Sequence, residues 1–290
     1  MALAAIATNP KSIRRFGTIP TDMLAELVAG AREDASERRS VRSLADVESA
    51  ATNRAPALDA LAALAPESQV KIIAEVKRAS PSRGPLAEIP DPAALAASYE
   101  SGGASVISVL TEARRFGGSL DDLELVKSTV SIPVLRKDFI SEPYQVFESR
   151  AAGADLVLLI VAALDQNVLK ELFDLVGELG MTALVETHSA DEVERALDVG
   201  ASVVGVNARN LSTFGLDRDL FGSLADSIPS GVIRVAESAV KTPADVAHYR
   251  SSGADAVLVG EALVTTGDPV GAIQEFRTVG SRVSSIFRES

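Results

Sequence analysis

VKIIAEVKRASPSRG, residues 70–84, is the stretch around which the chain is organised. Residues 70–76 form an apolar, β-branched run that predicts a buried strand. Glu75 and Lys77 lie two positions apart at its carboxyl end, so their side chains leave the strand on the same face. The proline and glycine that follow stop the strand and allow a tight turn. Because buried charges are costly, the stretch predicts the lip of an active site; a strand that ends in a surface salt bridge is the simpler alternative.

Further short apolar runs follow the first one, and stretches with apolar residues three and four apart separate them. The runs cover residues 105–110, 133–137, 155–160, 182–186, 202–207, 232–237 and 256–260. Continuous apolar strands that alternate with amphipathic helices indicate a parallel sheet that is covered by helices.

A short internal repeat precedes every second run. It stands as Gly103-Ala104-Ser105, Gly153-Ala154-Asp155, Gly200-Ala201-Ser202 and Gly253-Ala254-Asp255, roughly 50 residues apart. Glycine at such a point ends a helix. A repeat on alternate units suits a closed eight-stranded barrel, whose interior layers draw on alternate strands. An open, doubly wound sheet is the alternative, but it usually carries a glycine-rich dinucleotide fingerprint after its first strand, which this sequence lacks.

The predicted fold is therefore α/β, a (β/α)8 TIM barrel over residues 66–290 with an N-terminal helical extension over residues 1–65. One face of the extension carries Leu24, Leu27, Val28 and Ala31 at helical spacing. Because an apolar face must be buried, we expect the extension to pack on the barrel.

Composition excludes several classes of function. The formal net charge of −12 disfavours nucleic acids and anionic membranes as main partners, although it permits a small anionic ligand. No run approaches the roughly 18 apolar residues of a membrane span, and the amino end does not read as a secretory signal. The chain has no cysteine, and its histidines are His188 and His248, so neither a disulfide nor a cysteine or histidine metal site is expected. We expect a cytoplasmic monomer.

Charged and polar residues follow nearly every predicted strand, at the end of the barrel where active sites lie. In chain order the residues at these strand ends, all charged or polar apart from two phenylalanines and a glycine, are Glu75, Lys77, Ser80, Thr111, Glu112, Phe116, Lys137, Asp138, Phe139, Glu186, Asn207, Arg209, Glu237, Ser238, Gly260 and Glu261. A lysine in a low-dielectric mouth flanked by carboxylates can donate a proton near neutral pH or form a Schiff base. The loops after the last two strands often hold a phosphate. Surface charge could explain any one of these residues, but it does not explain all of them together.

Six motifs stand at these strand ends: residues 73–82 (IAEVKRASPS), 135–140 (LRKDFI), 184–186 (LVE), 205–211 (GVNARNL), 236–238 (AES) and 258–263 (LVGEAL). Together they resemble the indole-3-glycerol-phosphate synthase family of tryptophan biosynthesis. The match spans the whole barrel in order, and a helical extension before the barrel is also a feature of that family.

The resemblance implies a reaction without a cofactor. The substrate would be 1-(2-carboxyphenylamino)-1-deoxyribulose 5-phosphate, whose pyrrole ring is closed with loss of carbon dioxide and water to give indole-3-glycerol phosphate. In that family's terms, Lys137 is the general acid that protonates the ketone, and Glu186 is the partner acid and base in dehydration. Lys77, paired with Glu75, would steer the substrate carboxylate.

The resemblance also implies how the substrate is held. Asn207 and Arg209 would hold the anthranilate end and the hydroxyls, and Glu237 and Ser238 would line the ribulose chain. The phosphate would be bound by Ser80, Gly260 and the Glu261 backbone. The apolar wall for the aromatic ring would comprise Phe116, Phe139, Leu158 and Leu211.

Two departures from the family pattern leave an alternative open. Ala239 stands where the family usually carries glycine, and it would be strained if the turn requires a positive φ. Arg114-Arg115 is also less typical and could add positive charge to the mouth. A catalytically altered or silent phosphate-binding barrel is therefore the alternative. Phosphoribosylanthranilate isomerase is disfavoured because that family depends on a cysteine base. His188 is expected to be a loop or surface histidine.

Overall fold

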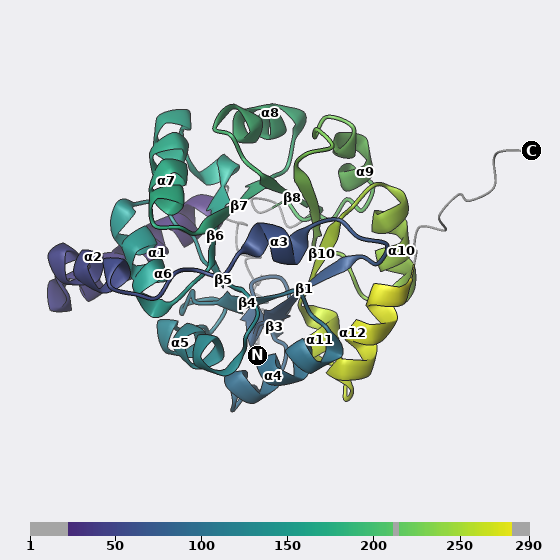
Figure 1. The fold of residues 1–290 in the computed structure, drawn as a ribbon, viewed down its shortest axis with the longest axis horizontal. Helices are drawn as coiled ribbons and strands as arrows, with labels where there is room; N and C mark the ends of the chain where they lie inside the picture. Colours follow the sequence, from purple (N-terminus) through teal and green to yellow (C-terminus); the bar gives the residue numbers. More distant parts are fainter. Residues whose placement is uncertain (1–22, 211–214, 280–290) are drawn as a thin grey trace, which may run out of the picture.

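The computed structural model describes residues 23–210 and 215–279, and within these ranges the strands form a closed parallel barrel. Neighbours around the barrel follow the order β1-β10-β9-β8-β7-β6-β5-β4, with β1 and β4 closing the ring (Figure 1). The strands are β1 (Lys71–Val76), β4 (Val106–Leu110), β5 (Val134–Lys137), β6 (Leu156–Ile160), β7 (Thr182–Thr187), β8 (Val203–Asn207), β9 (Ile233–Glu237) and β10 (Ala256–Val259). This topology confirms the predicted (β/α)8 TIM barrel.

Helices surround the barrel and connect its strands (Figure 1). They are α4 (Pro92–Gly102), α5 (Leu120–Thr129), α6 (Pro143–Ala152), η1 (Val161–Ala163), α7 (Gln166–Glu178), α8 (Ala190–Asp198), α9 (Leu220–Ala225), α10 (Pro243–Ser251), α11 (Glu261–Val264) and α12 (Pro269–Thr278). A small antiparallel hairpin, β2 (Ala79–Ser80) and β3 (Gly84–Pro85), follows β1.

Successive side chains of a strand enter different hydrophobic clusters. On β1, Ile72 and Ala74 pack in the cluster between the strands and the helices, whereas Ile73 packs in the cluster inside the barrel. Because the side chains alternate, Glu75 and Lys77 continue the inward row of Ile73 toward the carboxyl end of the strand. The pleat of each strand therefore decides which residues reach the mouth.

The glycine repeat marks helix ends, as expected. Gly103 and Gly153 cap α4 and α6 in the left-handed conformation, with φ of 94° and 98°. Gly200 and Gly253 have φ of 91° and 97° just after α8 and α10. A side chain with Cβ is disfavoured at such angles, so glycine turns the chain from each helix into the next strand.

Within its described residues, 23–65, the extension contributes three helices, α1 (Met23–Val41), α2 (Leu44–Thr52) and α3 (Ala60–Leu64). Ala60 and Leu64 of α3 are fully buried in the inner cluster with Ile73, and α3 lies across the middle of the barrel in Figure 1. The predicted apolar face of α1 is buried in the same cluster, which also contains Phe139 and Leu158. The domain boundary between residues 65 and 66 stays a prediction.

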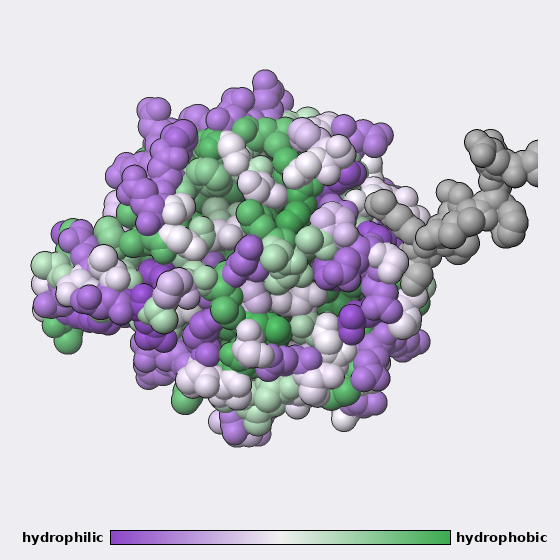
Figure 2. Space-filling model, in the orientation of Figure 1, coloured by the Kyte–Doolittle hydropathy of each residue, from purple (hydrophilic) through white to green (hydrophobic). Residues whose placement is uncertain are grey.

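Hydrophilic residues dominate the outer ring of helices on the face seen in Figure 2, while hydrophobic and weakly polar residues lie nearer its middle. Within residues 23–210 and 215–279, no helix combines the length and the hydropathy that crossing a membrane requires.

Candidate active site

One cavity of about 300 Å³ opens at the carboxyl ends of the strands. Its lining includes every residue to which the resemblance gave a part in the site, except Leu211, which lies outside the described residues; Thr111 and Glu112, which also follow a strand, do not line it. The barrel thus gathers Glu75, Lys77, Ser80, Phe116, Lys137, Phe139, Leu158, Glu186, Asn207, Arg209, Glu237, Ser238, Gly260 and Glu261 around one space. This juxtaposition supports a shared site, and the role of each residue in it is a separate question.

Lys137, the last residue of β5, lies between two carboxylates inside the cavity. Its Nζ is 2.7 Å from Glu237 Oε2 and 3.1 Å from Glu186 Oε2. Both glutamates are 1% exposed. Glu237 is the last residue of β9, and Glu186 lies near the end of β7. Buried charges are costly to remove from water, and these three are tolerated because each of them has a partner of opposite charge.

The protonation of these three groups follows from their surroundings. Burial lowers the pKa of Lys137, but the carboxylates of Glu237, Glu186 and Glu75 outweigh it and raise that pKa overall. Burial raises the pKa of Glu237 to about 7, with Lys137 opposing and Glu186 adding to the rise. For Glu186, burial also acts to raise the pKa, but Lys137, His188 and Asn207 leave it lowered.

Lys137 is therefore an ammonium in the free site at neutral pH. It carries the proton that a general acid needs, although the site binds that proton more tightly than the sequence reasoning assumed. A protonated amine is not a nucleophile, so this arrangement favours acid catalysis over the Schiff-base alternative.

Glu75 and Lys77 form an ion pair at the carboxyl end of β1. Gly260, at the end of β10, leaves the space for this pair, because a Cβ there would overlap the Glu75 carboxylate and lie 2.9 Å from Lys77 Nζ. The close approach explains why glycine stands at this position, a reason that is independent of any bound phosphate.

Asn207 links Glu186 to the loop that follows β9. Its side-chain amide donates to Glu186 Oε1 at 3.1 Å, and its amide oxygen accepts from Ser238 Oγ at 2.7 Å and from the Arg209 backbone N–H at 3.0 Å. Asn207 therefore fixes the Glu186 carboxylate and the start of the loops that carry Arg209 and Ser238.

The turn after β9 has the strained backbone that the sequence analysis considered. Ser238 and Ala239 have φ of 68° and 60°, and they are the non-glycine residues in the described ranges with positive φ. The turn does require the left-handed region, so Ala239 is strained there. The strain falls on the loop expected to bind phosphate, a frequent location for such backbone.

An apolar wall occupies the side of the cavity next to the extension. The rings of Phe116 and Phe139 lie 6.1 Å apart between centroids, and Leu158 lies in the same cluster. Leu24 and Leu27 of α1 belong to this cluster too. The extension thus supports the part of the cavity suited to an aromatic ring.

The sequence analysis did not single out Arg83, Gly205 or Lys241, which also shape the site. Lys241 lines the cavity beyond the strained turn, and Arg83 lines it from the first loop and pairs with Glu261 at 3.1 Å. Gly205 on β8 makes room for a catalytic candidate, because a Cβ there would overlap Glu237 Oε1. Its place inside a matching motif was the only signal in the sequence.

His188 lies in the loop after β7, as one of the two expectations had it, but it is not on the surface. Its side chain is only 9% exposed, with Nε2 3.5 Å from Glu186 Oε1 and Nδ1 3.4 Å from Glu192 Oε2. Burial lowers the pKa of His188, but Glu192 and Glu186 raise it overall. No group of three or more histidine or carboxylate side chains in the described ranges could hold a metal ion.

Comparison with known proteins gives one family. A family model described as Indole-3-glycerol phosphate synthase matches residues 24–276. A protein named Indole-3-glycerol phosphate synthase from Leifsonia xyli subsp. xyli is 70% identical over 261 residues, which cover 90% of this chain and 100% of that relative. A protein of the same name from Mycobacteroides abscessus is 58% identical over 262 residues, covering 90% of this chain and 96% of the relative.

Solved structures with similar folds are much more distant in sequence. A 3-hexulose-6-phosphate synthase from Salmonella typhimurium superposes with a TM-score of 0.61 at 17% identity, over 73% of this chain and 98% of its own. A thiamine phosphate pyrophosphorylase from Pyrococcus furiosus gives a TM-score of 0.55 at 15% identity, over 72% and 94% of the two chains. At such identities the likeness concerns the fold alone.

Proposed function

The chain belongs to the indole-3-glycerol phosphate synthase family, and from that premise we propose that it converts 1-(2-carboxyphenylamino)-1-deoxyribulose 5-phosphate to indole-3-glycerol phosphate, carbon dioxide and water. The enzyme acts in tryptophan biosynthesis, and the reaction makes it a carbon–carbon lyase of the carboxy-lyase class. The observation that carries the proposal is the position of Lys137, whose ammonium lies in the cavity between Glu186 and Glu237.

Ring closure needs an acid at the ketone oxygen. The aromatic carbon that bears the carboxylate attacks the ketone carbon, and Lys137 donates its proton to the oxygen as that bond forms. The iminium created in the ring accepts the electron pair released when carbon dioxide leaves. Glu237 can return a proton to Lys137, because its pKa of about 7 leaves it partly protonated at neutral pH.

Dehydration then needs a base and an acid on the closed ring. Glu186 remains a carboxylate at neutral pH because its pKa is lowered, so it is suited to take the proton that must leave for the indole to form. The hydroxyl leaves as water once Lys137 has protonated it. Asn207 holds the Glu186 carboxylate in place at 3.1 Å.

Binding groups are distributed along the cavity in a way that suits this substrate. The carboxyphenyl ring would lie on Phe116, Phe139 and Leu158, with its carboxylate near Lys77 and Arg209. The phosphate would lie at the other side, against Ser80, Ser238, Gly260 and the backbone of Glu261, where Arg83 and Lys241 add positive charge.

The chain itself offers a clean assay, because it contains no tryptophan. Purified protein is mixed with the synthetic substrate, and indole fluorescence is followed against a protein background without indole rings. We expect fluorescence to grow together with release of one carbon dioxide per product. Tight binding of substrate without either signal would instead indicate the silent phosphate-binding barrel.

A further inference from the structure

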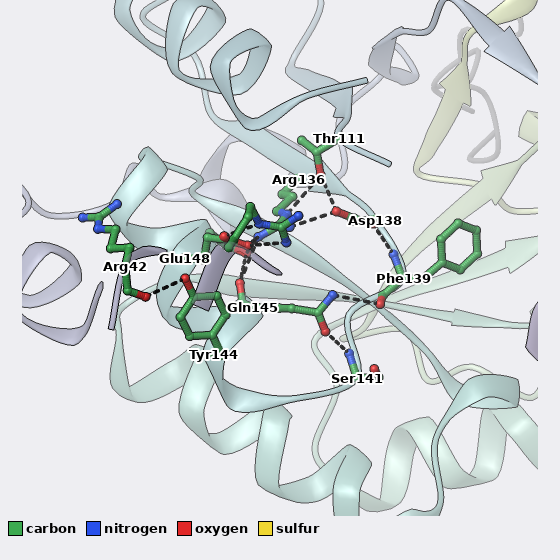
Figure 3. Close-up of polar contacts among 11 residues, drawn as sticks. Arg42, Thr111, Arg136, Asp138, Phe139, Ser141, Tyr144, Gln145 and Glu148 are labelled. Atoms are coloured by element: carbon green, nitrogen blue, oxygen red, sulfur yellow. Dashed lines mark hydrogen bonds and ion pairs between the residues drawn. The ribbon is translucent and has the colours of Figure 1, made fainter. Parts of the chain in front are cut away.

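A polar network around Arg136 joins β5 to helix α6 (Figure 3). Here "the β5 network" means Thr111, Arg136, Asp138, Gln145 and Glu148, which are all buried. Arg136 and Asp138 flank Lys137 in sequence. The side chain of Arg136 points away from the cavity because strand neighbours alternate, whereas Asp138 lies at the edge of the cavity lining and binds Arg136. None of the five belongs to the reaction described above.

Arg136 is the centre of the β5 network, and its side chain is 1% exposed. Its guanidinium donates to Thr111 Oγ1 at 3.0 Å, to Asp138 Oδ2 at 2.9 Å and to Glu148 Oε2 at 3.1 Å. It also donates to the backbone oxygen of Gln145 at 3.1 Å. One side chain thus joins the end of β4, the end of β5 and helix α6.

Asp138 connects Arg136 to the backbone that follows Lys137. Its Oδ2 accepts from Thr111 Oγ1 at 2.6 Å as well as from Arg136, while its Oδ1 accepts from the Phe139 backbone N–H at 2.8 Å. The Gln145 amide holds the next residues, donating to the Phe139 carbonyl at 3.2 Å and accepting from the Ser141 N–H at 2.8 Å. The backbone on the carboxyl side of Lys137 is therefore fixed by side chains.

Regular strand pairing holds Lys137 on one side only. Lys137 pairs with Leu110 of β4, whereas the pairing of β5 with β6 ends at Arg136 and Val157. A strand end with one neighbour has more freedom than a strand interior. The β5 network supplies the second constraint at this point.

The extension completes the charge balance of the β5 network. Arg38 of α1 donates from Nε to Glu148 Oε1 at 2.5 Å and from Nη2 to Glu148 Oε2 at 2.9 Å. Glu148 thereby has two guanidinium partners, Arg38 and Arg136. Because Arg38 offsets part of the negative charge of Glu148, Arg136 can bind Asp138 as well. Arg32 of α1 also donates to Ser141 Oγ at 2.8 Å, at the end of the same segment.

We propose that Arg136 and Asp138 are positioning residues that hold Lys137 and Phe139 in their catalytic arrangement, and that Arg38 of α1 keeps this pair in register by sharing the charge of Glu148. A buried ion network contributes little net stability compared with apolar packing, whereas a displacement of about 1 Å at a catalytic group can lower the rate about 10²-fold. The β5 network therefore acts on geometry. This inference rests on the proposed role of Lys137.

The first test is Asp138→Asn, alone and in a Lys137→Ala background. Asparagine keeps an oxygen for the Phe139 N–H but places an amide group against the donors of Arg136 and Thr111. We expect kcat to fall about 10²-fold while KM for the substrate changes less than about threefold. In the Lys137→Ala background the same change should alter kcat by no more than about twofold, because Asp138 acts through the lysine.

Equal effects of Asp138→Asn in both backgrounds would overturn the inference, as would wild-type kcat in folded Asp138→Asn. Normal turnover by Lys137→Ala itself would instead overturn the proposed function of Lys137. The two failures are therefore distinguishable.

Arg38→Gln is the second variant, for the case in which the buried substitution prevents folding. Arg38 lies at the edge of the network with a side chain 36% exposed, so the barrel should fold without it. We expect kcat to fall roughly three- to tenfold, with partial recovery in Arg38→Lys and no change in Arg39→Gln, an exposed neighbour of equal charge on α1. Equal kcat in Arg38→Gln and Arg39→Gln would contradict the part assigned to the extension.

Discussion

Lys137 and Glu237 are 100 positions apart in the chain, yet Lys137 Nζ lies 2.7 Å from Glu237 Oε2. Barrel closure produces this contact, because β5 and β9 present their carboxyl ends at the same rim. The contact makes the protonation of each group depend on the other, and it places a proton source beside a carboxyl group that titrates near neutrality.

Replacement of Lys137 by alanine removes the proposed acid. We expect Lys137→Ala to lower kcat roughly 10²–10⁴-fold, the usual contribution of a positioned acid, and steady-state indole fluorescence measures the change. Lys170→Ala, on the outside of α7, is the control and should be unaffected. Near-normal turnover by folded Lys137→Ala would remove Lys137 from its role.

Glu237 should give the protein a pH-dependent stability. Burial raises its pKa to about 7, above the value of about 4.3 for an exposed glutamate. Between these values the folded state binds more protons than the unfolded state, so the free energy of unfolding should fall as pH rises through this window. A glutamine in place of Glu237 cannot titrate. Denaturant unfolding at pH 5 and pH 7.5 should therefore show a smaller loss of the free energy of unfolding for Glu237→Gln than for the unchanged protein. An equal loss in both proteins would contradict the raised pKa.

Gly205 should be intolerant of a methyl group. A Cβ there would overlap Glu237 Oε1 and lie 3.3 Å from Leu184 Cδ1, so Gly205→Ala must displace the carboxylate from Lys137. We expect kcat to fall at least about tenfold, as measured with saturating substrate. Gly177→Ala is the matched control, because a Cβ there meets no atom within 4 Å apart from its chain neighbours and the backbone of its own helix, and it should keep full activity.

Ala239→Gly should stabilise the protein. The φ of 60° at Ala239 costs an L-residue about 1–2 kcal/mol, and the entropy that glycine adds to the unfolded chain offsets roughly half of this gain. We expect the free energy of unfolding to rise by about 0.5–1 kcal/mol in denaturant titrations. Ala97→Gly, in the middle of α4, should lower it by a similar amount. A loss of stability in Ala239→Gly would show that the turn is not strained.

Inorganic phosphate should compete with the substrate, since the proposed phosphate site is part of the cavity. Phosphate should raise the apparent KM and leave kcat unchanged. Lys241→Gln should weaken inhibition about fivefold, the effect of losing roughly 1 kcal/mol of charge interaction, whereas Lys170→Gln should not. Noncompetitive inhibition, or none at high phosphate concentration, would count against this site.

Local pattern was sufficient to predict the barrel. Apolar runs of strand length alternate with helical spacing, and glycines such as Gly103 and Gly153 stop the helices where the pattern changes. Parallel strands place their carboxyl ends on one rim, so residue type at each end also predicted which side chains share the cavity. A motif such as residues 135–140 added the chemistry, because the resemblance assigned a function to Lys137.

The sequence determined the strands, their inward rows and the residue types at the mouth, because these depend on neighbours along the chain. Only the tertiary structure decided how tightly Lys137 holds its proton, why Gly205 and Gly260 lack side chains, and how Arg38 of the extension reaches Glu148. These properties are set by distances of a few ångströms between residues far apart in sequence. Such distances do not exist until the barrel has closed and α1 has packed against it.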